Sequence, residues 1–225
     1  MVDTSIRERV ADYYSEKVRQ HGETARGVDW NSTDSQRTRF DQLLKVVPSE
    51  ATVVSSPTTE YSILDYGCGY GALIEALGEL GRPFRYVGFD LSEEMLSRAR
   101  RLHGEAASES AMSCEFTTNE EELEPCDYVV ASGVLNVKLD APLSEWKEYV
   151  LETLDALQRL SLRGFAFNAL TSYSDPELMR DDLFYADPGW LFDHCKRTYS
   201  GQVALLHDYG LYEFTVLVRK DLEGR

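Results

Sequence analysis

The sequence predicts an α/β protein in which helices cover both faces of a mostly parallel sheet. From residue 61 onward, short apolar runs alternate with segments of helical period, and the last two β-rich runs are joined by only a few residues. Alternation of this kind is typical of parallel βαβ units, whereas the short connection requires an antiparallel hairpin. With 225 residues and 43% hydrophobic content, the chain is long enough for one core, so we expect a single globular unit.

Two helices are expected to precede the sheet. Residues 5–20 and 34–47 carry apolar side chains at helical spacing, and Thr33 and Asp34 stand at the start of the second run as candidate caps. The stretch between the helices and the stretch 48–60 are rich in Gly, Pro or small polar residues, which is typical of loops.

The strands of the sheet are expected at apolar runs, in this order: YSILDY (61–66), FRYVGFD (84–90), MSCEFT (112–117), CDYVVAS (126–132) and RGFAFNAL (163–170). The helices between them are expected at 70–80, 92–103 and 142–160. The antiparallel hairpin is expected after residue 200, in the run GQVALLHDYGLYEFTVLVRK. Its turn is expected around Asp208 to Gly210. Residues 181–190, DDLFYADPGW, fit either a lid with aromatic walls or ordinary surface packing.

Composition narrows the class of protein. The 39 acidic and 23 basic residues give a formal charge of −16, which repels a phosphate backbone, so nucleic acid is disfavoured as a partner. No run approaches the roughly 18 apolar residues of a membrane-spanning helix, and the start lacks the apolar core of a secretory signal, so a cytoplasmic location is expected. The cysteines (Cys68, Cys114, Cys126, Cys195) lie far apart, so neither a metal site nor a disulfide framework is predicted.

The strongest chemical signal is the run ILDYGCGYGAL at residues 63–73. An apolar strand ends at Asp65 and leads into Gly67, Gly69 and Gly71 before a helix begins. Glycines are needed in such a loop because the turn requires unusual backbone angles and because a Cβ would keep a ligand away from the main chain. A dinucleotide-binding loop has a different spacing, G-x-G-x-x-G, with phosphates at the helix N-terminus.

The pattern D-x-G-x-G-x-G resembles motif I of the class I S-adenosylmethionine-dependent methyltransferases. The resemblance implies a sheet of order 3-2-1-4-5-7-6 with the last strand antiparallel. It also implies S-adenosylmethionine as cofactor, S-adenosylhomocysteine as product, and methyl transfer without a metal. Residues 61–225 would form the methyltransferase domain, and residues 1–60 would be N-terminal helices acting as a lid over the cofactor.

The same resemblance assigns cofactor contacts to the glycine loop. Asp65 would help to hold the amino end of the methionyl group, and the backbone of the residues from Gly67 to Gly71, which include Cys68, Gly69 and Tyr70, would lie along the cofactor. Asp90 ends the second strand, 25 residues after Asp65, where the family places the ligand of the ribose hydroxyls. A carboxylate there can accept two hydrogen bonds from a vicinal diol. Helix capping is the alternative role for Asp90, although Ser92 is the better cap.

Further contacts are implied around the rest of the cofactor. Leu91 and Met95 would flank the adenine, and Asn119 would meet its amino group, although Asn119 also fits a solvated acidic turn. The backbone of Ser132, Gly133 and Val134 would lie beneath the cofactor. Arg39 and Trp30 of the leading segment are also predicted to contact the cofactor, and Arg39 could pair with the methionyl carboxylate. Plain surface packing is the alternative role for both residues.

The acceptor is not identified by any motif. The chain lacks the N-P-P-aromatic run of aminomethylating enzymes, the glutamate pair of arginine methyltransferases and the acidic ligands of magnesium-dependent catechol enzymes, which leaves a small molecule by elimination. Substrate-side candidates are Asn136, His207, Tyr209 and Tyr212, although hairpin geometry explains the last three equally well. A non-catalytic S-adenosylmethionine-binding sensor or complex partner is the alternative function. The protein is expected to be a monomer or a homodimer.

Overall fold

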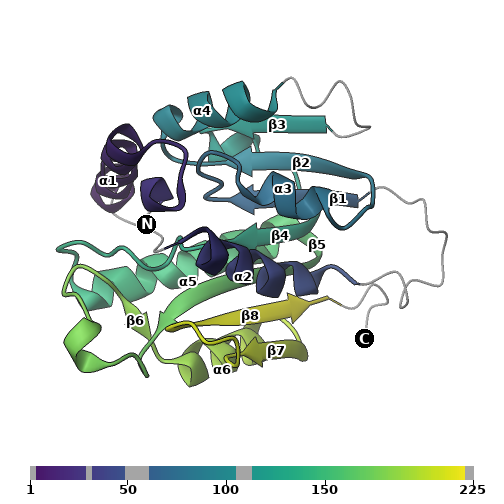
Figure 1. Cartoon of the computed structure of the whole chain (residues 1–225). Coiled ribbons are helices and arrows are strands. Elements are labelled where there is room, and N and C mark those ends of the chain that lie inside the picture. The colour runs from purple at the N-terminus through teal and green to yellow at the C-terminus, as the bar shows by residue number, and fades with distance from the viewer. Residues whose placement is uncertain (1–3, 29–31, 49–60, 105–112, 221–225) are drawn as a thin grey trace.

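The sheet of this protein has the predicted order and carries helices on both faces (Figure 1). The computed structural model describes residues 4–28, 32–48, 61–104 and 113–220. Its strands are β1 (Tyr61–Tyr66), β2 (Phe84–Phe89), β3 (Ser113–Thr117), β4 (Cys126–Ala131), β5 (Ser161–Thr171), β6 (Tyr185–Ala186), β7 (Gln202–Leu206) and β8 (Glu213–Arg219). The strand order β3-β2-β1-β4-β5-β8-β7 confirms the order 3-2-1-4-5-7-6, with the short β6 added beside β5.

Pairing within the sheet is parallel from β3 to β5 and antiparallel at β8. Strand β8 runs against both β5 and β7, so the two last strands form the expected hairpin. The carboxyl ends of the parallel strands therefore meet at one edge of the sheet, the left edge in Figure 1. Ligands bind at this edge in open α/β sheets, beside the point where the strand order reverses between β1 and β4.

The helices follow the expected positions closely. They are α1 (Thr4–His21), η1 (Ala25–Val28), α2 (Thr33–Leu43), η2 (Leu44–Val46), α3 (Leu73–Gly78), α4 (Glu93–His103), η5 (Glu120–Glu122), α5 (Leu143–Leu160), η6 (Pro176–Leu178) and α6 (Pro188–Thr198). Helices α2 and α3 pack their apolar sides on one face of the sheet, and α5 and α6 pack on the other.

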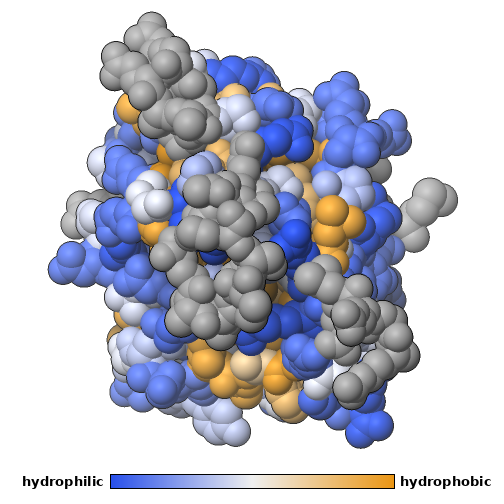
Figure 2. Space-filling view, turned by 90° about the vertical axis from the view of Figure 1, so that its right-hand side faces the viewer, coloured by the Kyte–Doolittle hydropathy of each residue, from blue (hydrophilic) through white to orange (hydrophobic). Residues whose placement is uncertain are grey.

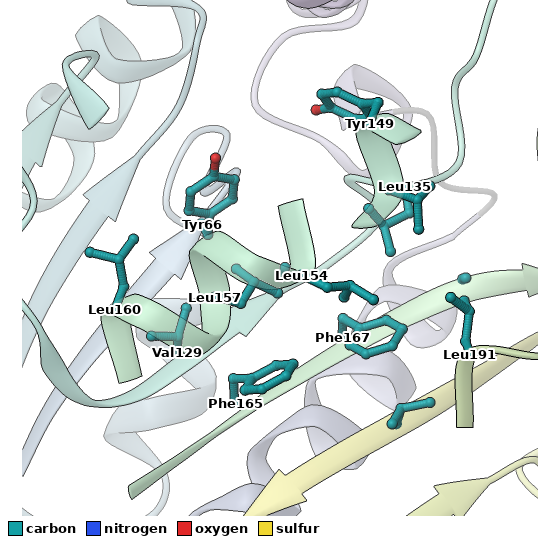
Figure 3. Close-up of a cluster of buried hydrophobic side chains, with 14 of the residues drawn as sticks. Tyr66, Val129, Leu135, Tyr149, Leu154, Leu157, Leu160, Phe165, Phe167 and Leu191 are labelled. Atoms are coloured by element: carbon teal, nitrogen blue, oxygen red, sulfur yellow. The ribbon is translucent and has the colours of Figure 1, made fainter. Parts of the chain in front are cut away.

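The core is divided by the sheet into two clusters because side chains of a strand alternate between its faces. On β1, Ile63 joins the cluster under α2 and α3, whereas Leu64 joins the cluster under α5. Figure 3 shows the second cluster, in which Leu154 and Leu157 of α5 face Phe165 of β5. These side chains are fully buried, so α5 is held to the sheet mainly by apolar packing.

Two local features differ from the sequence predictions. The N-cap of α2 is Ser32, and neither Thr33 nor Asp34 takes this role. The Ser32 hydroxyl accepts a hydrogen bond from the Ser35 amide, and the Ser35 hydroxyl accepts one from the Ser32 amide, which forms a reciprocal capping box. The candidates chosen from the start of the apolar run therefore lie one and two residues after the actual cap.

The second difference is a helix that the sequence analysis did not assign. Helix α6 begins within the segment 181–190, where Asp187 caps the backbone amides of Gly189 and Trp190 and Pro188 occupies the first helical position. A capping Asp followed by Pro is a helix-start signal that the aromatic content of this segment obscured. The segment is therefore β6 and a helix start packed on the core, where Phe184 and Ala186 are buried.

The surface is dominated by polar residues. Figure 2 views the face on the right-hand side of Figure 1, where hydrophilic side chains surround separate apolar patches, in keeping with the formal charge of −16. Among the described residues, no helix combines the length and the apolar character needed to cross a membrane. All of the cysteines are free thiols, and Cys126 is part of the core.

Candidate functional site

The glycine loop turns sharply between β1 and α3 because its backbone adopts angles that favour glycine. Gly67 and Gly69 have φ values of +84° and +56°. The amides of Gly67 and Cys68 both donate to the Phe89 carbonyl, at 2.7 and 2.9 Å, which holds the loop against the end of β2. A Cβ on Gly67 would lie 2.4 Å from Cγ2 of Val134, so the loop also passes too close to its neighbour for any larger residue.

Asp90 connects the end of β2 to this loop. One carboxylate oxygen accepts a hydrogen bond from the Gly69 amide at 2.8 Å, and the other accepts one from the Ser92 amide at 2.9 Å. Ser92 is the N-cap of α4 and accepts from the Met95 amide, as the sequence analysis expected. Burial raises the pKa of Asp90, although both backbone hydrogen bonds oppose this shift. Each oxygen keeps a lone pair for a ligand.

Asp65 lies beside Asp90 at the end of β1 and is almost fully buried. The Tyr86 hydroxyl donates to its carboxylate at 2.8 Å. Burial raises the pKa of Asp65 to about 7, and the negative charge of Asp90 adds to the rise, against the effect of the Tyr86 hydrogen bond. A cationic ligand beside Asp65 and Asp90 would therefore stabilise the charged form of both carboxylates.

These carboxylates line a cavity with about 890 Å³ of empty space, which we call the cofactor cavity. The structure brings together most of the residues predicted for cofactor binding: Asp65, Gly67, Cys68, Gly69, Tyr70, Asp90, Leu91, Met95, Ser132, Gly133 and Val134. The Ser132 hydroxyl is buried and has no hydrogen-bond partner in the part of the chain that the structure describes.

The leading helices complete the cofactor cavity. Arg7, Val10 and Tyr14 of α1 line it, as do Gln36 and Phe40 of α2. Sequence analysis expected these helices to cover the cofactor but did not identify the individual contact residues, because helical periodicity does not indicate which side chains of a helix reach a ligand.

Contacts at both ends of α1 hold it over the cofactor cavity. The Arg7 guanidinium donates to Glu120 at 2.5 Å, and the hydroxyls of Ser15 and Ser92 are hydrogen-bonded at 2.7 Å. Ile6 and Val10 are buried in the core cluster under α5. Apolar packing and these polar contacts together fix the helix against the sheet edge.

Three of the described residues predicted to contact the cofactor, Gly71, Asn119 and Arg39, are not in the wall of this cavity. Gly71 packs near His103, where a Cβ would approach the ring to 2.8 Å. Asn119 caps η5 and lines an adjoining hollow that shares Arg7 with the cofactor cavity. Trp30 lies outside the described residues. Arg39 is directed away from the glycine loop, into an ion pair.

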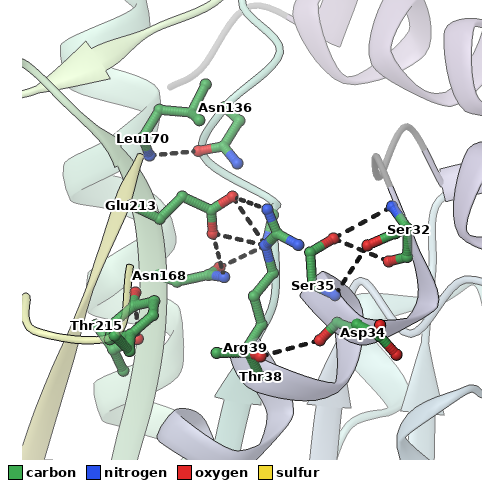
Figure 4. A network of polar contacts seen from close by, with 12 residues as sticks. Ser32, Asp34, Ser35, Thr38, Arg39, Asn136, Asn168, Leu170, Glu213 and Thr215 are labelled. Carbon is green, nitrogen blue, oxygen red and sulfur yellow. Dashed lines mark hydrogen bonds and ion pairs between the residues drawn. The ribbon is translucent and has the colours of Figure 1, made fainter. Parts of the chain in front are cut away.

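The partner of Arg39 is Glu213, the first residue of β8. Both carboxylate oxygens of Glu213 lie 2.8 Å from Nε of Arg39, and both side chains are buried (Figure 4). The Asn168 amide on β5 donates to Glu213 at 2.9 Å, and its oxygen accepts from the Gly133 amide at 2.7 Å. A continuous polar network therefore joins α2 and β8 to Gly133 in the wall of the cofactor cavity.

A second cavity, with about 1330 Å³ of empty space, lies beside the first at the carboxyl ends of β4 and β5. Tyr14 and Val28 belong to the walls of both cavities. Of the substrate-side candidates, Asn136 and Tyr212 line this second cavity. The Asn136 side-chain oxygen accepts from the Leu170 amide at 3.0 Å, which orients its amide group.

The remaining candidates lie elsewhere on the hairpin. The His207 ring packs against Tyr173 and Phe214, and it lines neither cavity. The Tyr209 hydroxyl is hydrogen-bonded to Thr215 at 3.0 Å, and burial raises the pKa of Tyr209 above its usual value. The hairpin's structural role therefore accounts for both residues in the observed arrangement.

Comparison with known proteins agrees with the geometry. Residues 64–160 match the family model described as a methyltransferase domain. The protein Rv1506c of Mycobacterium tuberculosis, which is assigned as a methyltransferase, is 53% identical over 160 residues that cover 71% of this chain and 93% of the relative.

Solved structures with the same fold include methyltransferases at low sequence identity. Magnesium protoporphyrin IX methyltransferase of Synechocystis, solved with bound S-adenosylmethionine, has a TM-score of 0.66 at 16% identity over 98% of this chain and 99% of its own. An S-adenosylmethionine-dependent methyltransferase of Aquifex aeolicus has a TM-score of 0.56 at 14% identity over 91% and 97%. The motif, the fold and the 53% identical relative agree: the chain belongs to the class I S-adenosylmethionine-dependent methyltransferases.

Proposed function

We propose that this chain binds S-adenosylmethionine in the cofactor cavity and transfers its methyl group to a small molecule held in the second cavity. The observation that carries the proposal is the pair of buried carboxylates, Asp65 and Asp90, on either side of the glycine loop. Their burial raises both pKa values, so the site favours a ligand that brings positive charge.

The residues of the cavity fit this cofactor in charge and shape. S-adenosylmethionine carries an ammonium and a sulfonium group and no phosphate, whereas a dinucleotide would bring its phosphates toward two buried carboxylates. Gly67 and Gly69 line the cavity, so the main chain of the loop is accessible to a ligand there. The buried Ser132 hydroxyl, which has no partner among the described residues, would be satisfied by a polar group of the ligand.

Individual roles follow from position. Asp90 would accept hydrogen bonds from the ribose hydroxyls, because backbone amides already orient both of its oxygens. Leu91 and Met95 would pack on the adenine, and Asp65 would hold the methionyl ammonium. Arg39 would act indirectly, by holding Glu213 and the network that ends at Gly133, rather than by pairing with the methionyl carboxylate.

When bound, the cofactor supplies a methyl group on a sulfonium centre, and an acceptor lone pair forms the new bond while the S–C bonding pair remains on sulfur. A hydroxyl or amine acceptor loses its proton to solvent after the transfer. The chain's contribution is alignment and the exclusion of water, which can account for a large part of the acceleration. We also propose that residues 1–60 act as the lid of a methyltransferase domain at 61–225, because α1 and α2 line the cofactor cavity.

A non-catalytic sensor that only binds S-adenosylmethionine is the rival function. The second cavity, which shares Tyr14 and Val28 with the first, favours transfer over sensing, because it offers an acceptor a position next to the cofactor.

Calorimetry with S-adenosylmethionine, S-adenosylhomocysteine and NAD tests the proposal. Asp90→Ala and Gly69→Val should each weaken binding of S-adenosylmethionine and S-adenosylhomocysteine by about tenfold or more. Asp90→Ala removes the proposed partner of the ribose hydroxyls, and Gly69→Val adds a side chain to the glycine loop. Asp127→Ala is the matched control, because Asp127 accepts a backbone amide hydrogen bond from Ser62 and lines neither cavity. Tight binding of NAD, or no binding of the first two ligands, would overturn the proposal.

A further inference from the structure

The wall of the second cavity is apolar over most of its extent. Its aliphatic members are Val28, Val137, Leu170, Leu178, Leu183 and Leu211, and the rings of Tyr14, Tyr185 and Tyr212 add further apolar surface. Binding of a ligand to an apolar wall is stabilised in proportion to the apolar surface that is removed from water. A ligand that fills this cavity therefore has an apolar body.

The charged side chains of the same wall are neutralised within the protein. Arg39 and Glu213 form a buried ion pair, and Asn168 adds a hydrogen bond to the carboxylate of Glu213. Arg180, which is partly exposed, pairs with Asp182 at 2.5 Å. A charged ligand would lose its hydration on entering the cavity, and every charged side chain of the wall already has an ion-pair partner within the protein. Binding of a charged ligand is therefore unfavourable.

The two signs of charge are disfavoured for different reasons. The whole chain has a formal charge of −16, which lowers the local concentration of anions near the surface. The Glu213 carboxylate of the wall is already paired with Arg39, so a cation inside the cavity would find no unpaired carboxylate among the described wall residues. Both effects favour a neutral ligand.

The Asn136 side-chain amide is a polar group of the wall that a ligand could match. The side-chain oxygen of Asn136 accepts from the Leu170 amide, and in Figure 4 the amide nitrogen points away from this contact. That nitrogen donates to no group of the described residues, and Asn136 is 5% exposed. A donor in such a place is best satisfied by an oxygen or nitrogen atom of a ligand.

We propose that the second cavity takes a neutral, mostly apolar acceptor that carries a hydrogen-bond-accepting oxygen or nitrogen opposite Asn136. This inference rests on the proposed function, because it assigns the substrate class of the same site. It excludes phosphorylated, carboxylated and quaternary ammonium acceptors, and it makes Asn136 a specificity-determining residue.

Three probes of one shape and different charge test the inference. The full chain, saturated with S-adenosylhomocysteine to fill the cofactor cavity, is titrated at pH 7 with 2-naphthol, 2-naphthoate or 2-naphthylmethylammonium, and binding is followed by calorimetry. The neutral probe should bind about tenfold or more tightly than either charged probe, because each of the others leaves a desolvated charge unpaired. Binding of S-adenosylhomocysteine is measured first in every sample.

Variants locate the probe in the cavity. Leu178→Asp places a negative charge in the wall and should weaken 2-naphthol binding while strengthening the cationic probe, whereas Leu162→Asp should change neither. The control is matched because the exposed fractions of Leu178 and Leu162 are 59% and 55%. Asn136→Asp keeps the oxygen that accepts from Leu170 but removes the donor, so it should also weaken 2-naphthol binding.

The outcomes separate the two proposals. If S-adenosylhomocysteine binds but a charged probe binds as tightly as 2-naphthol, or no probe binds, the neutral-acceptor inference is wrong and the cofactor assignment stands. The inference is also wrong if Leu178→Asp and Leu162→Asp have equal effects on 2-naphthol. If S-adenosylhomocysteine itself does not bind, the proposed function fails, and the acceptor assignment fails with it.

Discussion

The Arg39 guanidinium on α2 and the Glu213 carboxylate on β8 form a buried ion pair between residues 174 positions apart in the chain. Their exposed fractions are 5% and 2%. The pair joins the leading helices to the far strand of the sheet, and through Asn168 it reaches Gly133 in the cofactor cavity. The N-terminal region is therefore attached at the site itself, where its position affects both cavities.

Breaking this pair should destabilise the fold strongly. Arg39→Met leaves the Glu213 carboxylate buried with only the Asn168 amide as partner, so the free energy of unfolding should fall by about 3–5 kcal/mol. Urea denaturation measures this change. Arg37 lies on the same helix as Arg39 and forms an exposed pair with Glu79 at the end of α3, so Arg37→Met should leave the midpoint nearly unchanged. Equal effects of the two changes would contradict the structural role of Arg39.

Replacing Gly67 should damage the cofactor cavity specifically. Gly67→Ala introduces a Cβ 2.4 Å from Val134, in addition to the strain of a φ of +84°, and should weaken S-adenosylmethionine binding by about tenfold or more. Gly81→Ala is the control, because Gly81 has a similar φ of +66° and open space around it. Gly67→Ala combined with Val134→Ala should recover part of the affinity. Calorimetry measures these affinities. Equal losses of affinity for Gly67→Ala and Gly81→Ala would show that the glycine loop does not contact the cofactor.

Cofactor binding should release a proton near neutral pH. The pKa of Asp65 is raised to about 7, mainly by burial, so much of this carboxyl is protonated at pH 6.5 in the absence of a ligand. A cationic ligand favours the carboxylate, which lowers the pKa and expels the proton. Calorimetric titrations with S-adenosylmethionine in buffers of different ionisation enthalpy should detect this release, and Asp65→Asn should abolish it. Identical proton release from Asp65→Asn would assign the effect to another group.

The same carboxyl should make the ligand-free protein less stable as pH rises. The pKa of Asp65 in the folded state is about 7, above its ordinary value of 3.8, so between these values the folded state holds the proton more strongly than the unfolded state. Its contribution to the free energy of unfolding therefore falls as pH rises from about 4 to 7 and is constant above. Urea denaturation of the wild type and Asp65→Asn at pH 5 and pH 8 should show the variant gaining relative stability at pH 8. A constant difference would contradict the raised pKa.

The resemblance to the family supplied the strand order, whereas local patterns in the sequence were sufficient for the positions of the strands, the glycine loop and Asp90. These features depend on neighbouring residues: a strand ends, glycines follow, and an acidic residue ends the next strand. The partner of Arg39 could not be predicted in this way, because Glu213 meets it only after the sheet is assembled. The same holds for Tyr14, whose place in the walls of both cavities depends on how α1 packs.

Asn119 illustrates the limit of transferring a motif by position. It follows β3 as the family pattern requires, yet its side chain accepts from the Glu121 amide and caps η5. The alternative considered from the sequence, an acidic turn, describes this local geometry. Its contact with adenine remains a prediction, since it lines the hollow next to the cofactor cavity.

The most direct test of the central assignment is a crystal structure of the chain with S-adenosylhomocysteine. We expect the ribose hydroxyls within hydrogen-bond distance of the Asp90 carboxylate and the adenine against Leu91 and Met95, in the cavity lined by the glycine loop. Ligand density elsewhere, or an Asp90 carboxylate that contacts only the Gly69 and Ser92 amides while the ligand is bound, would contradict the assignment.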